Sequence, residues 1–448
     1  MSISYASGTR DSASLLDAAD RFVLGNVRPA RQVVFARGRG CRMWDADGRE
    51  YLDAVSGTMG VAMVGHAHPK VTERLTRQLT ELPSHAFWHL SAPVIELAER
   101  MSELAPNGPA KTYLCPGGGE GIDAAVKLAM AVTGRTEVVS LHGAYHGMSL
   151  AGMSLGGLPA YREWFPGHAR WPGFQQVPSP DPYRPSLGAA GDWRPAARAL
   201  EATLDRGTYH SVAAVIFELV QGPGGHVELP LEYVAEVRRI CDQRGILLIV
   251  DEVQTGIGRC GAVWASDLYR VRPDIVVIGK AFGGGFPFGG VVAAADLVTR
   301  EIEASPWHIL TFGNQPLQAA AGLAVLDIVE EEGLVSRAAV LGDRARRRFR
   351  ELAGRYPVIG DVRGPGLFIG VDLVTDRETR DPATAACTRA REYALDIGLL
   401  TGFGGAGNVL KFKPPLTSTD EEIDAMLDRC EQLIDFVDSA VRDGRGQG

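Results

Sequence analysis

Lys280 is one of six lysines in the chain, and it stands where an α/β protein places reactive groups. It follows the apolar run 274–279 and precedes the three glycines of 283–285. Parallel sheets bind their ligands where strands open into such loops. Burial there lowers the pKa of an amine, which can then attack a carbonyl and form a Schiff base. A lysine that only extends to solvent has the same local sequence, so this reading needs support from other residues.

Asp251 gives that support. It ends the apolar run 246–250, and a carboxylate at a buried strand end needs a cation or a metal as its partner. The protonated pyridine nitrogen of pyridoxal phosphate is such a cation, and the cofactor needs an acid there to act as an electron sink. The alternative role is a helix N-cap. Asp251 and Lys280 end successive apolar runs with room for a crossover, which predicts that both point into one crevice.

A glycine-rich turn offers a place for the phosphate. Gly118 and Gly119 lie between the predicted strand 111–115 and the predicted helix 120–132. Glycines let backbone N–H groups approach an anion at a helix N-terminus. The same turn is also a purely structural device, so it supports a phosphate site only together with Lys280 and Asp251.

The same turn partly matches a dinucleotide fingerprint, through Gly119, Gly121 and Ala124. Two observations argue against that interpretation. Glu120 puts a negative charge inside the loop, and the next predicted strand ends at His142 without an acidic residue to bind a ribose. We therefore favour a phosphate cradle without a dinucleotide.

Tyr145 follows that next strand, within the segment 142–147. An aromatic ring at this position is able to stack on a planar cofactor. Ordinary packing against the core or at the surface explains it equally well without the other motifs.

Short apolar runs and helical patterns alternate through the middle of the chain, which predicts a mostly parallel sheet with helices on both faces. The helical patterns include 122–132 and 231–244. The strands are expected at 111–115, 137–141, 213–219, 246–250, 275–278 and 290–295.

The C-terminal third has another pattern. A long basic helix is predicted over 333–355, and a strand over 408–414. Thr419 and Glu422 have the spacing of a capping box at the start of a final helix. We therefore expect three segments: residues 1–65, which join a small domain; a large cofactor-binding domain, 66–330; and a small α+β domain, 331–448.

The overall composition narrows the function. The net charge is −8, so nucleic acid and anionic membranes are not expected partners. The six cysteines form no CxxC pair, which predicts neither a metal site nor a disulfide framework. The polar N-terminus lacks the pattern of a signal peptide, so we expect a cytoplasmic protein.

With these residues in view, nearly the whole chain resembles the class III (ornithine/ω-amino acid type) aminotransferases of fold type I. The resemblance is carried by five motifs. They are 44–53 (WDADGREYLD), 65–69 (GHAHP), 251–256 (DEVQTG), 273–280 (PDIVVIGK) and 311–316 (TFGNQP).

The resemblance implies a role for each cofactor-site residue, with pyridoxal 5′-phosphate as the cofactor. The enzyme is then expected to be a homodimer with its active site at the interface. The implied roles are Schiff-base lysine and catalytic residue for Lys280, partner of the pyridine nitrogen for Asp251, neighbour of the phenolic oxygen for Gln254, phosphate lining for Gly118 and Gly119, ring stacking for Tyr145, the glutamate of the family's EP-x-x-G segment for Glu218, and contact with the phosphate of the other subunit for Thr311.

The substrate side departs from the family pattern. Many members carry an arginine before the PPL segment that grips the substrate carboxylate, and this chain has Lys411. Lysine cannot form the same bidentate fork, and it is also able to point to solvent from its strand. By resemblance Phe87 and Trp88, with Met59, form an aromatic and apolar wall of the substrate pocket. An aromatic core cluster is the alternative.

The resemblance predicts ping-pong transfer of an amino group between an amine or amino acid and a keto acid. The stretches 359–364 and 376–380 look like those of dialkylglycine decarboxylase. A decarboxylating transaminase and an amino-acid racemase or epimerase on the same frame therefore remain alternatives. A non-catalytic protein that binds pyridoxal phosphate is disfavoured because Lys280 and Asp251 are both present.

Overall fold

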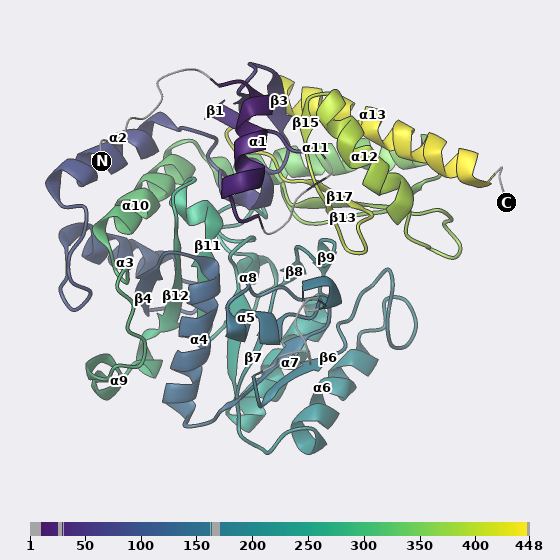
Figure 1. The fold of residues 1–448 in the computed structure, drawn as a ribbon. Helices are drawn as coiled ribbons and strands as arrows, with labels where there is room; N and C mark the ends of the chain where they lie inside the picture. Colours follow the sequence, from purple (N-terminus) through teal and green to yellow (C-terminus); the bar gives the residue numbers. More distant parts are fainter. Residues whose placement is uncertain (1–9, 26–28, 30, 162, 164–170, 446–448) are drawn as a thin grey trace.

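A seven-stranded sheet forms the centre of the molecule (Figure 1). The computed structural model describes residues 10–25, 29, 31–161, 163 and 171–445. Within them, the central strands lie in the order β4 (Ala110–Cys115), β12 (Gly289–Ala294), β11 (Ile275–Gly279), β10 (Leu247–Asp251), β7 (Val212–Phe217), β5 (Glu137–Leu141) and β6 (Phe174–Val177).

Most neighbours in this sheet are parallel, as predicted, but β12 is antiparallel to both β11 and β4. The connection from β11 to β12 spans only residues 280–288. A parallel crossover needs about a dozen residues or more, so this chain has to reverse. The strand predicted over 290–295 is present as β12, and it is the antiparallel member of the mostly parallel sheet.

Helices cover both faces of the sheet because successive strand side chains point to opposite sides. Leu248 and Val250 of β10 lie in one apolar cluster with α6 (Arg194–Arg206) and α7 (Leu231–Arg244). Ile249, between them, lies in a second cluster with α4 (Gly118–Thr133). Val276 of β11 packs in a third cluster, which includes α3 (Ala92–Leu104) and α10 (Pro316–Glu331).

The two ends of the chain meet in a second layer of structure. The N-terminal and C-terminal elements lie together above the central sheet in Figure 1, and β3 pairs in parallel with β15. One sheet has the order β1 (Phe35–Arg39), β2 (Arg42–Asp45), β3 (Glu50–Asp53) and β15 (Leu399–Leu400). The other has the order β13 (Ile359–Arg363), β14 (Ile369–Leu373), β17 (Val409–Phe412) and β16 (Phe403–Gly404).

Three helices pack with these sheets: α11 (Leu334–Arg355), α12 (Thr384–Asp396) and α13 (Asp420–Arg445). The predicted capping box precedes α13. The backbone N–H of Thr419 donates to Glu422 at 3.0 Å, and the N–H of Glu422 donates to Thr419 Oγ1 at 3.2 Å. These bonds satisfy helix donors that have no partner within the helix.

None of the helices in the described part of the chain is long and apolar enough to cross a membrane. Shorter elements complete this part of the chain. They are α1 (Ser12–Phe22), η1 (Ser56–Gly60), α2 (Pro69–Glu81), α5 (Leu150–Leu155), η2 (Pro159–Tyr161), β8 (Val220–Gln221), β9 (Val227–Glu228), α8 (Ala265–Leu268), η4 (Lys280–Gly283), η5 (Ala295–Leu297) and α9 (Arg300–Ala304).

Candidate active site

Lys280 follows the last residue of β11 and adopts a backbone conformation that is rare for lysine, with φ at 47°. Strained backbone of this kind concentrates at functional sites. Burial lowers the pKa of its amine, while Asp251 and Glu218 act in the opposite sense. Among the described residues, Lys280 Nζ makes no hydrogen bond or ion pair. The amine is therefore free for chemistry with another molecule.

Asp251 is the last residue of the neighbouring strand β10, so the two strand ends lie side by side. Its carboxylate is buried. Oδ2 lies 2.9 Å from Nδ1 of His146, and Oδ1 accepts from the backbone N–H of Val253 at 3.1 Å. No helix begins at Asp251, so the N-cap alternative does not apply. His146 itself is buried, and its Nε2 has no partner in the described structure.

Sequence reasoning missed the role of His146. The signal was present in the segment 142–147, where a second histidine directly follows Tyr145. Its partner Asp251 is more than 100 residues away along the chain. Nothing in local spacing identifies such a pair.

Glu218 follows β7, the next strand in the sheet, so three adjacent strand ends carry Glu218, Asp251 and Lys280. Its carboxylate is buried and accepts hydrogen bonds from the backbone N–H groups of Tyr145 at 2.8 Å and Gly222 at 3.0 Å. Burial, with a further effect from Asp251, raises the pKa of Glu218 to about 7. Glu218 therefore fixes the backbone that carries the Tyr145 ring.

The glycine-rich turn has the close packing that a cradle requires. Gly118 and Gly119 begin α4, and the first N–H groups of a helix have no acceptor within it. A Cβ at Gly118 would lie 3.1 Å from a methyl group of Val253. A Cβ at Gly147 would lie 2.9 Å from Cα of Gly119. A side chain at position 118 or 147 would therefore crowd the packing around this turn.

Two lysines approach the same site from the other layer. Lys411 is in β17 and Lys413 follows it, so both side chains leave the same face of the strand. Lys413 Nζ donates to Oε1 of Gln254 at 2.9 Å. Sequence reasoning had assigned no role to Lys413, because only the tertiary structure brings it to Gln254.

Lys411 does not point to solvent, and that alternative was wrong. Only 7% of its surface is exposed, and Phe412 beside it is buried as well. The Lys411 side chain passes Gly404, where a Cβ would lie 2.8 Å from its Cε. Burial lowers the pKa of Lys411 to about 8, and the charge of Lys280 adds to the effect. Its ammonium makes no hydrogen bond to another described side chain.

The predicted wall residues lie on other elements. Met59 is half-buried in η1. The rings of Phe87 and Trp88 contact each other at 4.7 Å between centroids, and 68% of Trp88 is exposed. Thr311 is also exposed. The element η1, which carries Met59, contacts η4, which begins with Lys280. Among the described residues of this single chain, no hydrogen bond or ring contact joins Phe87, Trp88 or Thr311 to Lys280 or Asp251.

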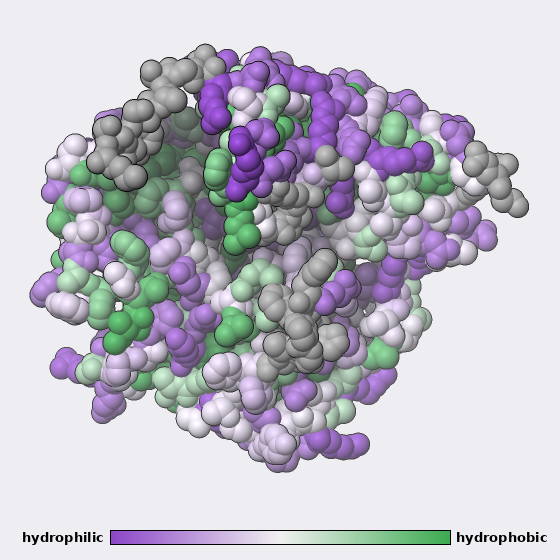
Figure 2. All heavy atoms as spheres, viewed as in Figure 1, coloured by the Kyte–Doolittle hydropathy of each residue, from purple (hydrophilic) through white to green (hydrophobic). Residues whose placement is uncertain are grey.

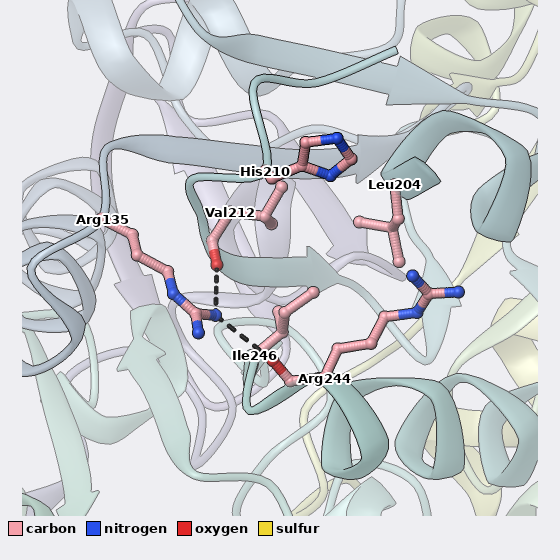
Figure 3. A pocket seen from close by; sticks show the side chains of 6 residues that line it. All are labelled: Arg135, Leu204, His210, Val212, Arg244 and Ile246. Carbon is pink, nitrogen blue, oxygen red and sulfur yellow. Dashed lines mark hydrogen bonds between the residues drawn. The ribbon is translucent and has the colours of Figure 1, made fainter. Parts of the chain in front are cut away.

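A separate hollow lies at the opposite, amino edge of the sheet (Figure 3). Arg135 faces it, but its guanidinium donates to the backbone carbonyls of Val212 at 3.1 Å and Gly245 at 2.9 Å. Arg244 is paired there with Asp205. These cations are already used by the protein itself, so we place the candidate site at the carboxyl edge.

The comparisons with known proteins agree with this geometry. The family model described as aminotransferase class-III matches residues 25–434. Diaminobutyrate–2-oxoglutarate aminotransferase of Rhizobium meliloti (strain 1021) is 39% identical, over 94% of this chain and 92% of that protein. Isoleucine 2-epimerase of Lentilactobacillus buchneri is 34% identical, over 98% of this chain and 97% of that protein.

A solved structure extends the likeness to the fold and the cofactor. An amine transaminase from an uncultivated Pseudomonas species, solved in its pyridoxal-phosphate-bound form, has a TM-score of 0.84 and 32% sequence identity. The match covers 92% of this chain and 97% of that chain. The fold and its neighbours thus define a pyridoxal-phosphate-dependent transferase of fold type I.

The chain belongs to the class-III aminotransferase family, and it is a pyridoxal-phosphate-dependent aminotransferase. This family takes amine and keto-acid substrates. The predictions of family, fold type, enzyme class and cofactor are confirmed.

Proposed function

We propose that Lys280 holds pyridoxal phosphate as a Schiff base and that the enzyme transfers an amino group from an amino acid to a keto acid. One observation carries this proposal. Lys280, whose amine makes no bond, lies at the end of a strand whose neighbour ends in Asp251, and Glu218 follows the next strand along the sheet. Lysine and carboxylates in this order suit a cofactor with an aldehyde at one end of its ring and a basic nitrogen at the other.

The surrounding residues fit the other parts of the cofactor. The N–H groups of Gly118 and Gly119 would hold the phosphate at the N-terminus of α4. Tyr145, held by Glu218, would stack on the ring, and Gln254 would face the phenolic oxygen. Asp251, oriented by His146, would keep the pyridine nitrogen protonated. Each of these roles follows from the resemblance and is compatible with the contacts described above.

Bound pyridoxal phosphate supplies an electron sink that stabilises negative charge on a substrate carbon. The protein has to hold the groups around it and move a proton. Lys280 is the residue placed for proton transfer. Because its pKa is lowered, a larger fraction of its amine than usual is uncharged and able to accept a proton. Asp251 keeps the sink effective, because the ring nitrogen withdraws electrons best when it is protonated.

We assign Lys411 to the substrate carboxylate. It is a buried cation, its ammonium makes no hydrogen bond to another described side chain, and the charge of Lys280 acts on it. An ammonium attracts an anion but orients it less strictly than the fork of an arginine. Met59 and the aromatic pair Phe87 and Trp88 would add an apolar wall. The expected substrates are therefore amino acids with an apolar side chain.

A racemase or epimerase is the second candidate, and the similarity to isoleucine 2-epimerase favours it. Lys280 would then remove and return the proton at the same substrate carbon, and no keto acid would be consumed. A decarboxylating transaminase would instead release carbon dioxide. These three reactions need the same Lys280 and Asp251, so only the products separate them.

The proposed enzyme is a homodimer. Gln315 joins the loop of Phe87 and Trp88 to the loop of Thr311 through two hydrogen bonds with the backbone of His85, at 3.1 and 3.0 Å. Figure 2 shows apolar surface over the region between the labels α3 and α9 of Figure 1. The exposed apolar side chains on these two loops are Trp88, Leu90, Ile309 and Phe312.

A partner seated there would bury these side chains and bring Thr311 to the other subunit's phosphate. Obligate interfaces commonly bury more than about 2,000 Å². Light scattering at assay concentration tests this, and a catalytically competent monomer would contradict it. The six cysteines are all free thiols, which suits the proposed cytoplasmic location.

The test of the main proposal has two stages. Borohydride reduction of the purified enzyme, followed by peptide mapping, should place the cofactor on Lys280; a label on any other lysine contradicts the assignment. A screen of amino donors and keto-acid acceptors, with chiral analysis of recovered substrate, then identifies the reaction. Formation of a new amino acid supports transamination, and loss of optical purity without a new amino acid supports racemisation.

A further inference from the structure

Lys413 is a fully buried lysine that the roles above do not use. Only 1% of its surface is exposed, and its backbone is held on both sides. Its N–H donates to the carbonyl of Ala54 at 2.8 Å, and its own carbonyl accepts from Ser56 Oγ at 2.7 Å. Ser56 Oγ in turn accepts from the guanidinium of the buried Arg259 at 3.0 Å. The start of the Lys413 side chain is therefore fixed by the fold.

The side chain ends at Gln254. Lys413 Nζ lies 2.9 Å from Oε1 of Gln254 and 5.7 Å from the centre of the Phe368 ring. An ammonium has three N–H donors and no acceptor, so it has to meet the oxygen of a carboxamide and not its nitrogen. The protonated form of Lys413 therefore holds the Gln254 amide with its oxygen toward Nζ.

The nitrogen of the same amide is consequently turned away from Lys413. Nε2 of Gln254 lies against Gly222, where a Cβ would be only 2.5 Å away. The N–H of Gly222 is bonded to Glu218, so this nitrogen lies beside the row of strand-end residues. Gln254 is half-buried, and its Nε2 makes no hydrogen bond within the described chain. An unused donor therefore remains at the edge of the site.

We propose that Lys413 is a positioning residue, which holds the Gln254 carboxamide with its nitrogen toward the site so that Gln254 donates a hydrogen bond to an oxygen of the bound cofactor. The phenolic oxygen is that acceptor, a step that rests on the cofactor site proposed above. A glutamine without Lys413 would be free to rotate its amide and present an acceptor instead. Lys413 thus acts on the cofactor through Gln254, without touching it.

The charges around Lys413 set the conditions for a test. Lys411, Lys280 and Arg259 act on it as neighbouring cations, and Asp53 acts as an anion. The imidazole of the buried His226 is close enough to feel its charge, and neither His226 nitrogen has a partner in the described structure. Burial and the cations lower the pKa of Lys413 well below its usual value. The restriction on Gln254 is therefore strongest at lower pH, where the ammonium has no lone pair.

The experiment measures the bound cofactor by its visible absorption and not by turnover. Apoenzyme of the full chain is titrated with pyridoxal phosphate, and the absorption band of the holoenzyme is followed against pH. The variants are Lys413→Met, Lys413→Arg, Gln254→Leu and the double variant Lys413→Met with Gln254→Leu. Thermal unfolding of each variant shows whether it is folded.

A hydrogen-bond donor beside the phenolic oxygen stabilises the deprotonated form of the link between Lys280 and the cofactor. Removing this donor therefore raises the pH at which half of the link has lost its proton, which is the midpoint of the change in the absorption band. One net hydrogen bond corresponds to roughly a three- to tenfold change in an equilibrium. Lys413→Met should raise the proton affinity of the link by that factor, which moves the midpoint up by about half to one pH unit. It should also weaken cofactor binding by a similar factor. Lys413→Arg keeps only donors and should restore the wild-type midpoint.

Coupling separates a positioning role from a structural one. If Lys413 acts through Gln254, the double variant should match Gln254→Leu alone, because the second substitution has nothing left to disturb. An unchanged midpoint in Lys413→Met, or additive shifts in the double variant, would overturn the proposal. If Lys413→Met does not fold, the variant Gln254→Glu is used in its place. One carboxylate oxygen of that glutamate would pair with Lys413, and the other would present an acceptor to the phenolic oxygen where the wild type presents a donor. A midpoint in Gln254→Glu no higher than in Gln254→Leu would equally overturn the proposal.

These outcomes differ from failure of the proposed function. A wild-type enzyme without the visible band, or with the borohydride label away from Lys280, would refute the cofactor site itself. A normal wild-type band with no coupling between Lys413 and Gln254 would refute only the positioning role.

Discussion

The two sides of the candidate site treat their charged groups differently. On the strand-end side, Asp251 and Glu218 are each bound by two partners, among them backbone N–H groups and His146. On the β17 side, the ammonium of Lys413 has one hydrogen-bond partner, and the ammonium of Lys411 has none among the described side chains. The carboxylates are thus completed by the protein, while the lysines leave hydrogen-bonding capacity unused.

This difference indicates what each side is for. Burying an unpaired charge is costly, and replacing such groups by apolar residues often stabilises a protein. Lys411 and Lys413 are therefore difficult to explain by stability. The bonded carboxylates of Asp251 and Glu218 suit a cofactor that stays in place, and the unbonded ammonium of Lys411 suits an anionic substrate that comes and goes.

The strongest test of the cofactor side is Lys280→Ala. Loss of both the covalent attachment and the proton-transfer group should reduce kcat by a factor on the order of 10³ or more. The borohydride label should disappear as well. Lys70→Ala is the matched control, because Lys70 is an exposed lysine paired with Glu331 at the surface. Residual activity within tenfold of the wild type would contradict the role of Lys280.

Asp251→Asn should have the next largest effect. Asparagine preserves the size and part of the hydrogen bonding but removes the charge that keeps the ring nitrogen protonated. We expect kcat to fall by roughly 10²- to 10³-fold, which is about 3 to 4 kcal/mol in the barrier. Steady-state kinetics at saturating cofactor measure it, and mass spectrometry should still find the cofactor on Lys280. A variant with normal kcat would show that Asp251 only packs the strand end.

Lys411→Ala tests the β17 side. The apparent affinity for a carboxylate-bearing substrate should fall by roughly one to two kcal/mol, with a neutral amine affected little. The pKa of Lys411 is lowered to about 8, so the ammonium is lost as the pH rises through that value. The KM of the wild type for acidic substrates should therefore rise above this pH, and the variant should lack that rise. An equal response of acidic and neutral substrates would remove Lys411 from carboxylate binding.

The smallest expected effect concerns the stability of the apoenzyme. The pKa of Glu218 is raised from 4.5 to about 7, so the folded protein holds this proton more tightly than the unfolded chain. The free energy of unfolding then falls as the pH rises from about 4.5 to about 7. In this interval the unfolded chain has released the proton of Glu218, while the folded protein still holds it.

Glu218→Gln removes this dependence. Its thermal midpoint, relative to the wild type, should therefore improve by a few degrees between about pH 5 and about pH 8. Calorimetry of both apoenzymes measures the difference. A difference that does not change with pH would mean that Glu218 titrates normally.

The sequence by itself determined those features that depend on neighbouring residues. Apolar runs ending in Asp251 and Lys280 predicted both strand ends, and the spacing of Thr419 and Glu422 predicted the start of α13. Two adjacent parallel strands must place their ends at one edge, so the meeting of Asp251 and Lys280 followed as well. The division into the segments 1–65, 66–330 and 331–448 stays a prediction.

Only the tertiary structure decided the contacts between distant segments. His146 lies beside Asp251 at a separation of 105 residues, and Lys413 reaches Gln254 across 159 residues. The same holds for Lys411, whose strand pattern allowed either the solvent or the interior. Periodicity records which residues share a face of one element, but it does not record what that face packs against. The burial of these side chains, their hydrogen-bond partners and the lowered pKa values of the lysines arise from that packing, so only the tertiary structure determines them.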